Sequence, residues 1–222
     1  MPKLILFLVT LLLFSCNNKI DTPAIDTDVS QILNLTLDKV IGSDTTWRYH
    51  MKLPPPPIPI IAFTDKVDSV EYLKTVSWRD SAQKVLDTAA LFVAISKENE
   101  NIVERYIDNI EHQIRNSKSD TSFNGVLHQL CNQRISKDTI DIAILKPRHN
   151  FKILDASTAP NDRLRRIGSL RFSKIAFNET KDKACVYTSF SCGEWCGNGD
   201  IHLYLKKDGK WKYVKTWELW VS

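Results

Sequence analysis

The sequence predicts an α+β protein, with N-terminal helices packed on a C-terminal antiparallel β-meander of about four strands. Two observations favour this class. Apolar residues recur at helical spacing before residue 132, whereas residues 168–222 form short runs rich in Val, Tyr, Thr and Phe that are separated by turn signals. Helices and strands that are segregated along a chain are typical of α+β folds. The 222-residue chain has no internal repeat and is long enough for one sizeable core, so we expect a single domain over residues 28–222.

The N-terminus predicts export and a lipid anchor. Lys3 precedes an apolar run, Leu4 to Phe14, which has the length of a secretion signal and is too short to span a bilayer. The run leads into Leu-Phe-Ser-Cys ending at Cys16, which resembles the lipobox of bacterial lipoproteins. That resemblance implies removal of residues 1–15 as a signal peptide, and lipidation of Cys16 with diacylglycerol and an acyl chain such as palmitate. An ordinary secretion signal is the alternative.

A lipidated chain would be anchored to a membrane of the cell envelope, with residues 16–27 as a polar tether. Asn17, directly after the lipid cysteine, favours the outer membrane over retention at the inner one, and leaves open the periplasmic or the surface face. The formal net charge is +4, and loss of Lys3 with the signal lowers it further. So small an excess gives no reason to expect a nucleic-acid partner.

Helical spacing predicts the first helix from Asp28 to Ile41. We expect Asp28 to be its N-cap, and Gly42 lies where a C-terminal glycine belongs. Residues 53–61 contain five prolines and are expected to form a stiff connector. A ligand for an aromatic-lined groove in a partner is the alternative for this strip.

The middle of the chain predicts more helices and one buried strand. Two short helices are expected near residues 67–76 and near Ser81, and the apolar run 89–95 is typical of a buried strand. A longer helix is expected to begin at Ser96 as its cap, and another helical stripe covers residues 123–131.

Asp208-Gly209 lies between two strand-like runs and predicts a two-residue type I′ hairpin turn. Such a turn fixes the register, so Tyr204 would oppose Tyr213 and His202 would oppose Lys215. One face would then carry His202, Tyr204, Trp211, Tyr213 and Trp217. An aromatic stripe of this kind is more often core than binding platform. If the chain binds a partner through its sheet, the candidate binding surface is formed by Trp195, His202, Tyr204, Tyr213 and Trp217.

Cys192 and Cys196 flank a glycine-containing loop that permits three interpretations. A disulfide between them fits a short hairpin loop and an oxidising compartment, and we favour it. A redox-active pair normally has two intervening residues rather than three. A zinc site could add Cys185 and His202, although the spacing matches no common finger. The remaining thiols, Cys131 and Cys185, are expected either to pair or to be buried separately.

The sequence contains no phosphate-binding glycine loop, nucleophile elbow or HExxH helix. We therefore expect no catalytic residues, no bound metal and no cofactor, and predict a non-enzymatic binding module of the cell envelope. Its partner would be an envelope protein or a glycan. The alternative is an envelope metal-dependent hydrolase or a thiol-redox protein that uses Cys192, Cys196 and His202.

The C-terminal pattern resembles uncharacterised exported lipoproteins of Bacteroidota type. The residues that carry this resemblance are a strand at Phe172–Phe177, a Cys-Gly-x-x-Cys-Gly loop within Cys192–Gly199, and a Gly-Lys-Trp hairpin within Asp208–Trp220. They cover a small part of the chain. The resemblance implies export and a β-meander, and it implies no activity.

Overall fold

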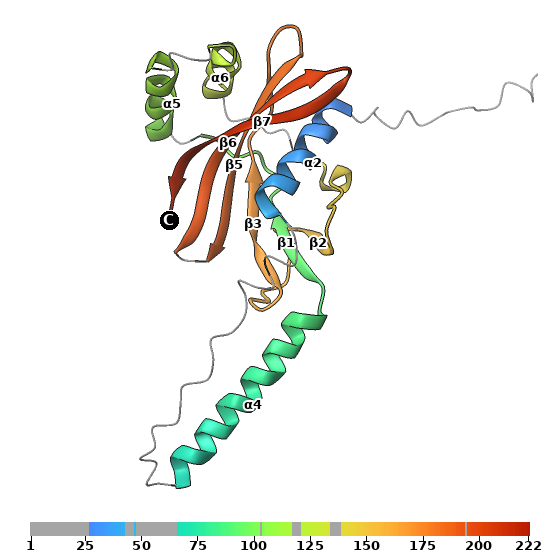
Figure 1. Cartoon of the computed structure of the whole chain (residues 1–222), viewed down its shortest axis with the longest axis vertical. Helices are drawn as coiled ribbons and strands as arrows, with labels where there is room; N and C mark the ends of the chain where they lie inside the picture. The colour runs from blue at the N-terminus through green and yellow to red at the C-terminus, as the bar shows by residue number, and fades with distance from the viewer. Residues whose placement is uncertain are drawn as a thin grey trace, which may run out of the picture.

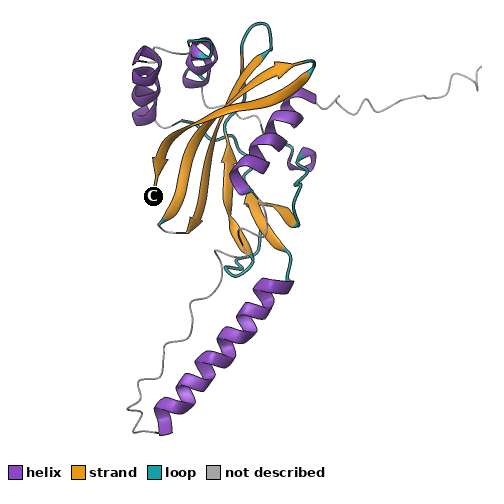
Figure 2. Cartoon of the chain, viewed as in Figure 1, coloured by secondary structure: helices purple, strands orange, loops and turns teal. Residues whose placement is uncertain are grey.

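The computed structural model describes residues 27–42, 47, 66–102, 104–116, 121–133, 139–193 and 195–222. Within these residues the chain forms four α-helices, one short 3-10 helix and a mixed sheet of seven strands (Figures 1 and 2). Because the helices lie mostly before the strands in the sequence, the α+β class is confirmed. The predicted signal peptide 1–15, the lipidation site Cys16 and the proline-rich strip 53–61 lie outside the described residues.

The sheet has the strand order β2-β1-β3-β5-β6-β7, and β4 pairs with β5 beside this path. Its strands are β1 (Leu91–Ile95), β2 (Phe151–Asp155), β3 (Arg166–Phe172), β4 (Ala176–Phe177), β5 (Lys183–Gly193), β6 (Cys196–Lys207) and β7 (Lys210–Val221). The expected antiparallel meander corresponds to β3, β5, β6 and β7. It is extended by β1, which pairs in parallel with β2 and β3. All five residues of β1 are buried, as expected for a parallel strand covered on both faces.

Helix α2 (Thr27–Ile41) covers one face of the sheet, which we call the α2 face. Residues on α2 and on this face share one core cluster that includes Leu33, Leu37, Val93, Phe172, Val186, Tyr204 and Trp211. The predicted helix end is confirmed, because Gly42 follows with a positive φ of 64°. The prediction that Asp28 is the N-cap was wrong, because Asp28 lies inside the first turn of α2. Its carboxylate accepts hydrogen bonds of 2.8 and 2.7 Å from Nζ of Lys206 in β6.

Helices α5 (Glu104–Asn116) and α6 (Asn124–Cys131) cover part of the opposite face, which we call the α5–α6 face. The second core cluster lies there and includes Ile110, Val126, Leu127, Cys185, Tyr187, Ile201 and Leu203. Figure 1 shows both helices near one end of the long strands. The helix expected to start at Ser96 begins later, and the Ser96 hydroxyl instead accepts a hydrogen bond from the Glu98 amide.

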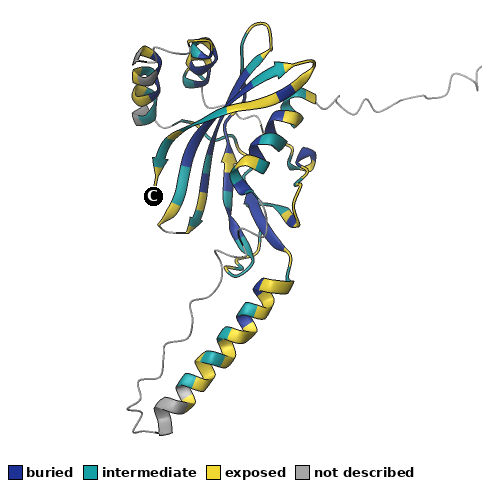
Figure 3. Ribbon diagram, in the orientation of Figure 1, coloured by how far each residue is buried: buried dark blue, intermediate teal, exposed yellow. Residues whose placement is uncertain are grey.

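Helix α4 (Lys66–Thr88) is one continuous helix, so the expectation of two short helices was wrong. Its sequence contains neither glycine nor proline to interrupt it. Figure 3 shows α4 extending away from the sheet with most of its described surface exposed, while Ala82 and Leu86 near its end are buried. Among the described helices, α4 included, none is long and apolar enough to cross a membrane.

Candidate functional site

The β6–β7 hairpin positions most of the residues that the sequence singled out. Asp208 and Gly209 both have positive φ, 52° and 71°, so the predicted type I′ turn is confirmed. The register next to the turn is also as predicted, and Tyr204 opposes Tyr213. The Asp-Gly pair is suited to this turn because glycine, and to a smaller extent aspartate, tolerates positive φ.

Beyond Tyr213 the register departs from the prediction. A β-bulge leaves Val214 opposite no residue of β6, so that Lys215 opposes Leu203, and Thr216 opposes His202. The expected pairing of His202 with Lys215 was therefore wrong. Because side chains alternate between faces, one extra residue moves the following side chains of β7, as far as Glu218, to the other face. Trp217 consequently pairs with Ile201 and packs on the α5–α6 face.

The candidate binding surface predicted from the sequence does not form one patch. Tyr204 is completely buried on the α2 face, where its hydroxyl lies 2.8 Å from Oγ1 of Thr36. His202 is 2% exposed on the same face, whereas Trp217 lies on the opposite one. Tyr213 is 37% exposed, and Trp195, at the tip of the β5–β6 hairpin, is 87% exposed. Trp195 is thus the one member of the five that is fully accessible.

The imidazole of His202 is held between two threonines. Its Nε2 lies 2.9 Å from Oγ1 of Thr188, and its Nδ1 lies 3.0 Å from Oγ1 of Thr216. The Tyr213 hydroxyl lies 2.9 Å from the same Thr216 oxygen. Burial, with a smaller contribution from the charge of Lys39, lowers the pKa of His202 to about 4. A neutral histidine in a closed ladder of hydroxyl groups stabilises the sheet, and it has no open side from which to act on a substrate.

The cysteines have two different environments. Cys192 and Cys196 form the predicted disulfide, with a Cα–Cα distance of 5.1 Å. Cys131 and Cys185 are free thiols of the α5–α6 face. Burial raises the pKa of Cys131 to about 11 and raises that of Cys185 as well. The two thiols are therefore protonated and weakly reactive at neutral pH.

The zinc set considered from the sequence is not brought together. Cys185 lies on the α5–α6 face and His202 on the α2 face, while Cys192 and Cys196 are bonded to each other. Among the described residues, no three His, Cys, Asp or Glu side chains are placed to share a metal ion.

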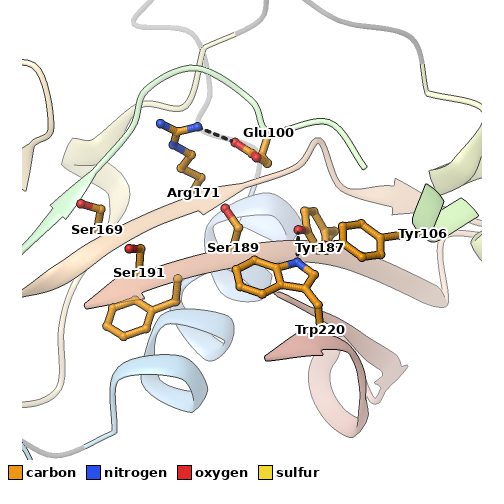
Figure 4. A pocket seen from close by; sticks show the side chains of 9 residues that line it. Glu100, Tyr106, Ser169, Arg171, Tyr187, Ser189, Ser191 and Trp220 are labelled. Carbon is orange, nitrogen blue, oxygen red and sulfur yellow. Dashed lines mark hydrogen bonds and ion pairs between the residues drawn. The ribbon is translucent and has the colours of Figure 1, made fainter. Parts of the chain in front are cut away.

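A groove that the sequence analysis missed lies on the open part of the α5–α6 face (Figure 4). It encloses about 360 Å³, and its lining consists of Glu100, Tyr106, Ser169, Arg171, Tyr187, Ser189, Phe190, Ser191 and Trp220. The serines and Arg171 come from β3 and β5, where Arg171 opposes Ser189 and Ser169 opposes Ser191. Arg171 reaches over the strand to Glu100, with 3.1 Å between Nη1 and Oε2.

Trp220 forms another side of the groove and is fixed in place by β6. A second bulge leaves Leu219 opposite no residue of β6, so Trp220 opposes Gly199 and turns toward the α5–α6 face. The indole lies directly on Gly199, where any Cβ would overlap it. Its Nε1 donates a 3.0 Å hydrogen bond to the hydroxyl of Tyr187. One side of the ring is thus held against the strand, as expected where glycine permits close approach.

Part of this groove has a signal in the sequence. Ser169 and Arg171 in β3, and likewise Ser189 and Ser191 in β5, are polar residues spaced by two, a pattern that indicates one polar face once the strands are known. Glu100 has no such signal, because only the tertiary fold brings it to β3.

The buried state of His202 predicts how stability depends on pH. Between pH 6.5 and 4 the unfolded chain takes up a proton on this histidine that the folded chain does not, so the free energy of unfolding should fall as the pH falls. The loss should reach about 3 kcal/mol, since one pKa unit corresponds to about 1.4 kcal/mol. Urea denaturation at several pH values measures it. His202→Gln should flatten the slope, whereas His128→Gln, at an exposed position on α6, should not. An unchanged slope in His202→Gln would contradict this assignment.

Comparison with known proteins identifies no relative of this chain. No protein-family model matches the sequence. No curated protein matches it, and no solved structure matches the fold.

Proposed function

We propose that the chain is a membrane-anchored lipoprotein that serves as a non-enzymatic binding module of the cell envelope. The apolar N-terminal run and the lipobox-like tetrad at Cys16 support the anchor. The Cys192–Cys196 disulfide supports an oxidising compartment, since such bonds are rare in the cytosol. The asparagine after Cys16 favours the outer membrane, and lipid on Cys16 is the proposed contact with it.

The observation that carries the binding function is the groove on the α5–α6 face. Its side chains are positioned by one another before any ligand arrives, through the Arg171–Glu100 ion pair and the Trp220–Tyr187 hydrogen bond. Preset side chains lose little conformational entropy on binding. None of the described residues that line the groove is a histidine or a cysteine. The arrangement therefore favours recognition over histidine or thiol chemistry.

Trp195 provides a second contact surface for an envelope partner. It lies at the tip of a hairpin that the Cys192–Cys196 disulfide closes, and it exposes 87% of its surface. Large aromatic side chains are enriched at binding interfaces. The alternative function, a metal-dependent hydrolase or thiol-redox protein using Cys192, Cys196 and His202, has less support because His202 is buried and the groups do not converge.

The anchor can be tested by fractionation of cells that express the full chain. After a high-salt and urea wash that removes protein held only by non-lipid contacts, Cys16→Ser should be released from the membrane fraction and the unchanged chain should stay, because the variant cannot receive the lipid. Cys131→Ser also removes one thiol but leaves the lipobox intact, so this control should stay with the membranes. A Cys16→Ser protein that stays with detergent-extractable membranes after this wash would contradict the lipid anchor.

The binding function can be tested with the same Cys16→Ser chain after purification. It should co-sediment with envelope fragments, and Arg171→Gln should reduce the bound fraction severalfold because the groove loses its cationic hydrogen-bond donor. Lys212→Gln, an exposed change of equal charge on β7, should leave retention unchanged. Trp195→Ala reports separately on the hairpin tip. If no variant, including the double change at Arg171 and Trp195, alters retention, neither surface is the binding site.

A further inference from the structure

The charges around the groove restrict what it can bind. Arg171 is 58% exposed in its side chain and is paired with Glu100, which is 22% exposed, so the two charges cancel at the mouth of the groove. A phosphate or carboxylate ligand would be attracted by Arg171 and repelled by Glu100. The local electrostatics therefore favour a neutral ligand that can both donate and accept hydrogen bonds.

The hydroxyl groups of the groove form an ordered array. Ser169 and Ser191 face each other across β3 and β5, and Ser189 lies opposite Arg171 in the same ladder. Figure 4 shows these three serines on the same side of the two strands, below the Arg171–Glu100 pair. Arg166, which does not line the groove, donates a hydrogen bond to the Ser169 hydroxyl at the end of the row and so fixes its orientation. The array matches a ligand with several hydroxyl groups at short spacing.

An apolar ligand would fit this polar groove poorly. It would bury the hydrogen-bonding positions that Arg171, Glu100 and the serine hydroxyls keep open beyond their contacts with one another, and unsatisfied buried polar groups are strongly destabilising. A polyhydroxylated ligand replaces the water that these groups lose with hydrogen bonds of its own. It can also use the planar guanidinium and carboxylate as two-pronged partners for adjacent hydroxyls.

Trp220 supplies the apolar component. Its indole lies on Gly199, and the bond from Nε1 to the Tyr187 hydroxyl fixes the orientation of the ring. A rigid aromatic ring beside a row of polar groups suits a molecule with one C–H face and a rim of hydroxyls. The pyranose ring of a sugar has this shape, and the groove volume of about 360 Å³ is at the lower end for small-molecule sites.

We propose that the groove is a carbohydrate site that takes a short segment of a neutral oligosaccharide. Trp220 stacks on the C–H face of one sugar ring, while Arg171, Glu100 and Ser189 hydrogen-bond its hydroxyls. This inference rests on the proposed binding function and identifies the chemical class of the ligand.

The test is titration of the purified Cys16→Ser chain with defined saccharides, followed by NMR of the tryptophan indole N–H signals and by calorimetry. The neutral probes are cellotetraose, maltotetraose, mannotetraose and tetra-N-acetylchitotetraose, and trigalacturonic acid is the anionic probe. At least one neutral tetrasaccharide should bind and shift the Trp220 indole signal. Arg171→Gln should weaken that affinity about tenfold or more, as expected for a hydrogen bond from a charged group. Ser189→Ala should weaken it less, and Lys212→Gln should not change it.

The possible results distinguish failure of the carbohydrate assignment from failure of the proposed binding function. Envelope retention that depends on Arg171, without binding of any neutral tetrasaccharide, would overturn the carbohydrate assignment and leave the binding module intact. Binding of trigalacturonic acid alone would show that the ligand is anionic and would also overturn it. If the well-folded Cys16→Ser chain neither binds any of the saccharides nor co-sediments with envelope fragments, both proposals are refuted. Circular dichroism of each variant verifies folding.

Discussion

The register between β6 and β7 determines which side chains reach each face of the sheet. The Asp208-Gly209 turn fixes the pairing at one end, and bulges at Val214 and Leu219 change it twice along β7. The first bulge turns Trp217 to the α5–α6 face. The second is needed because residues three apart in a straight strand point to opposite faces, and it brings Trp220 to the same side. Without both bulges, Trp220 would oppose Gly197 and its indole would not lie on Gly199.

The two faces of the sheet consequently have different roles. The α2 face is sealed by apolar packing and by satisfied buried polar groups, including the Thr36–Tyr204 contact and the ladder around His202. Buried polar groups that keep their partners add specificity to a fold without opening a site. The α5–α6 face is covered only in part, and its open area carries the groove. The tightly packed core and the proposed binding groove therefore lie on opposite faces of one sheet.

Local chemistry explains what the sequence could predict. The I′ turn, the first helix, the buried strand β1 and the Cys192–Cys196 disulfide each depend on residues close together in the chain. The bulges could not be predicted, because Val214 and Leu219 are ordinary strand residues whose place is decided by packing against β6 and the helices. The groove depends on the same packing and on a contact between Glu100 and Arg171, which are 71 residues apart. His202 and Tyr204 became core under α2, as was favoured for an aromatic stripe, so they do not belong to the candidate binding surface.

The most direct test of this account is the cross-strand register of β6 and β7, measured by nuclear Overhauser contacts between backbone protons in the isotope-labelled chain. The account predicts contacts between His202 and Thr216, between Asp200 and Glu218, and between Gly199 and Trp220. Contacts between His202 and Lys215 and between Asp200 and Trp217 would instead reveal a straight register. In that case Trp217 would lie on the α2 face, and Trp220 would not oppose Gly199, where its indole lines the groove.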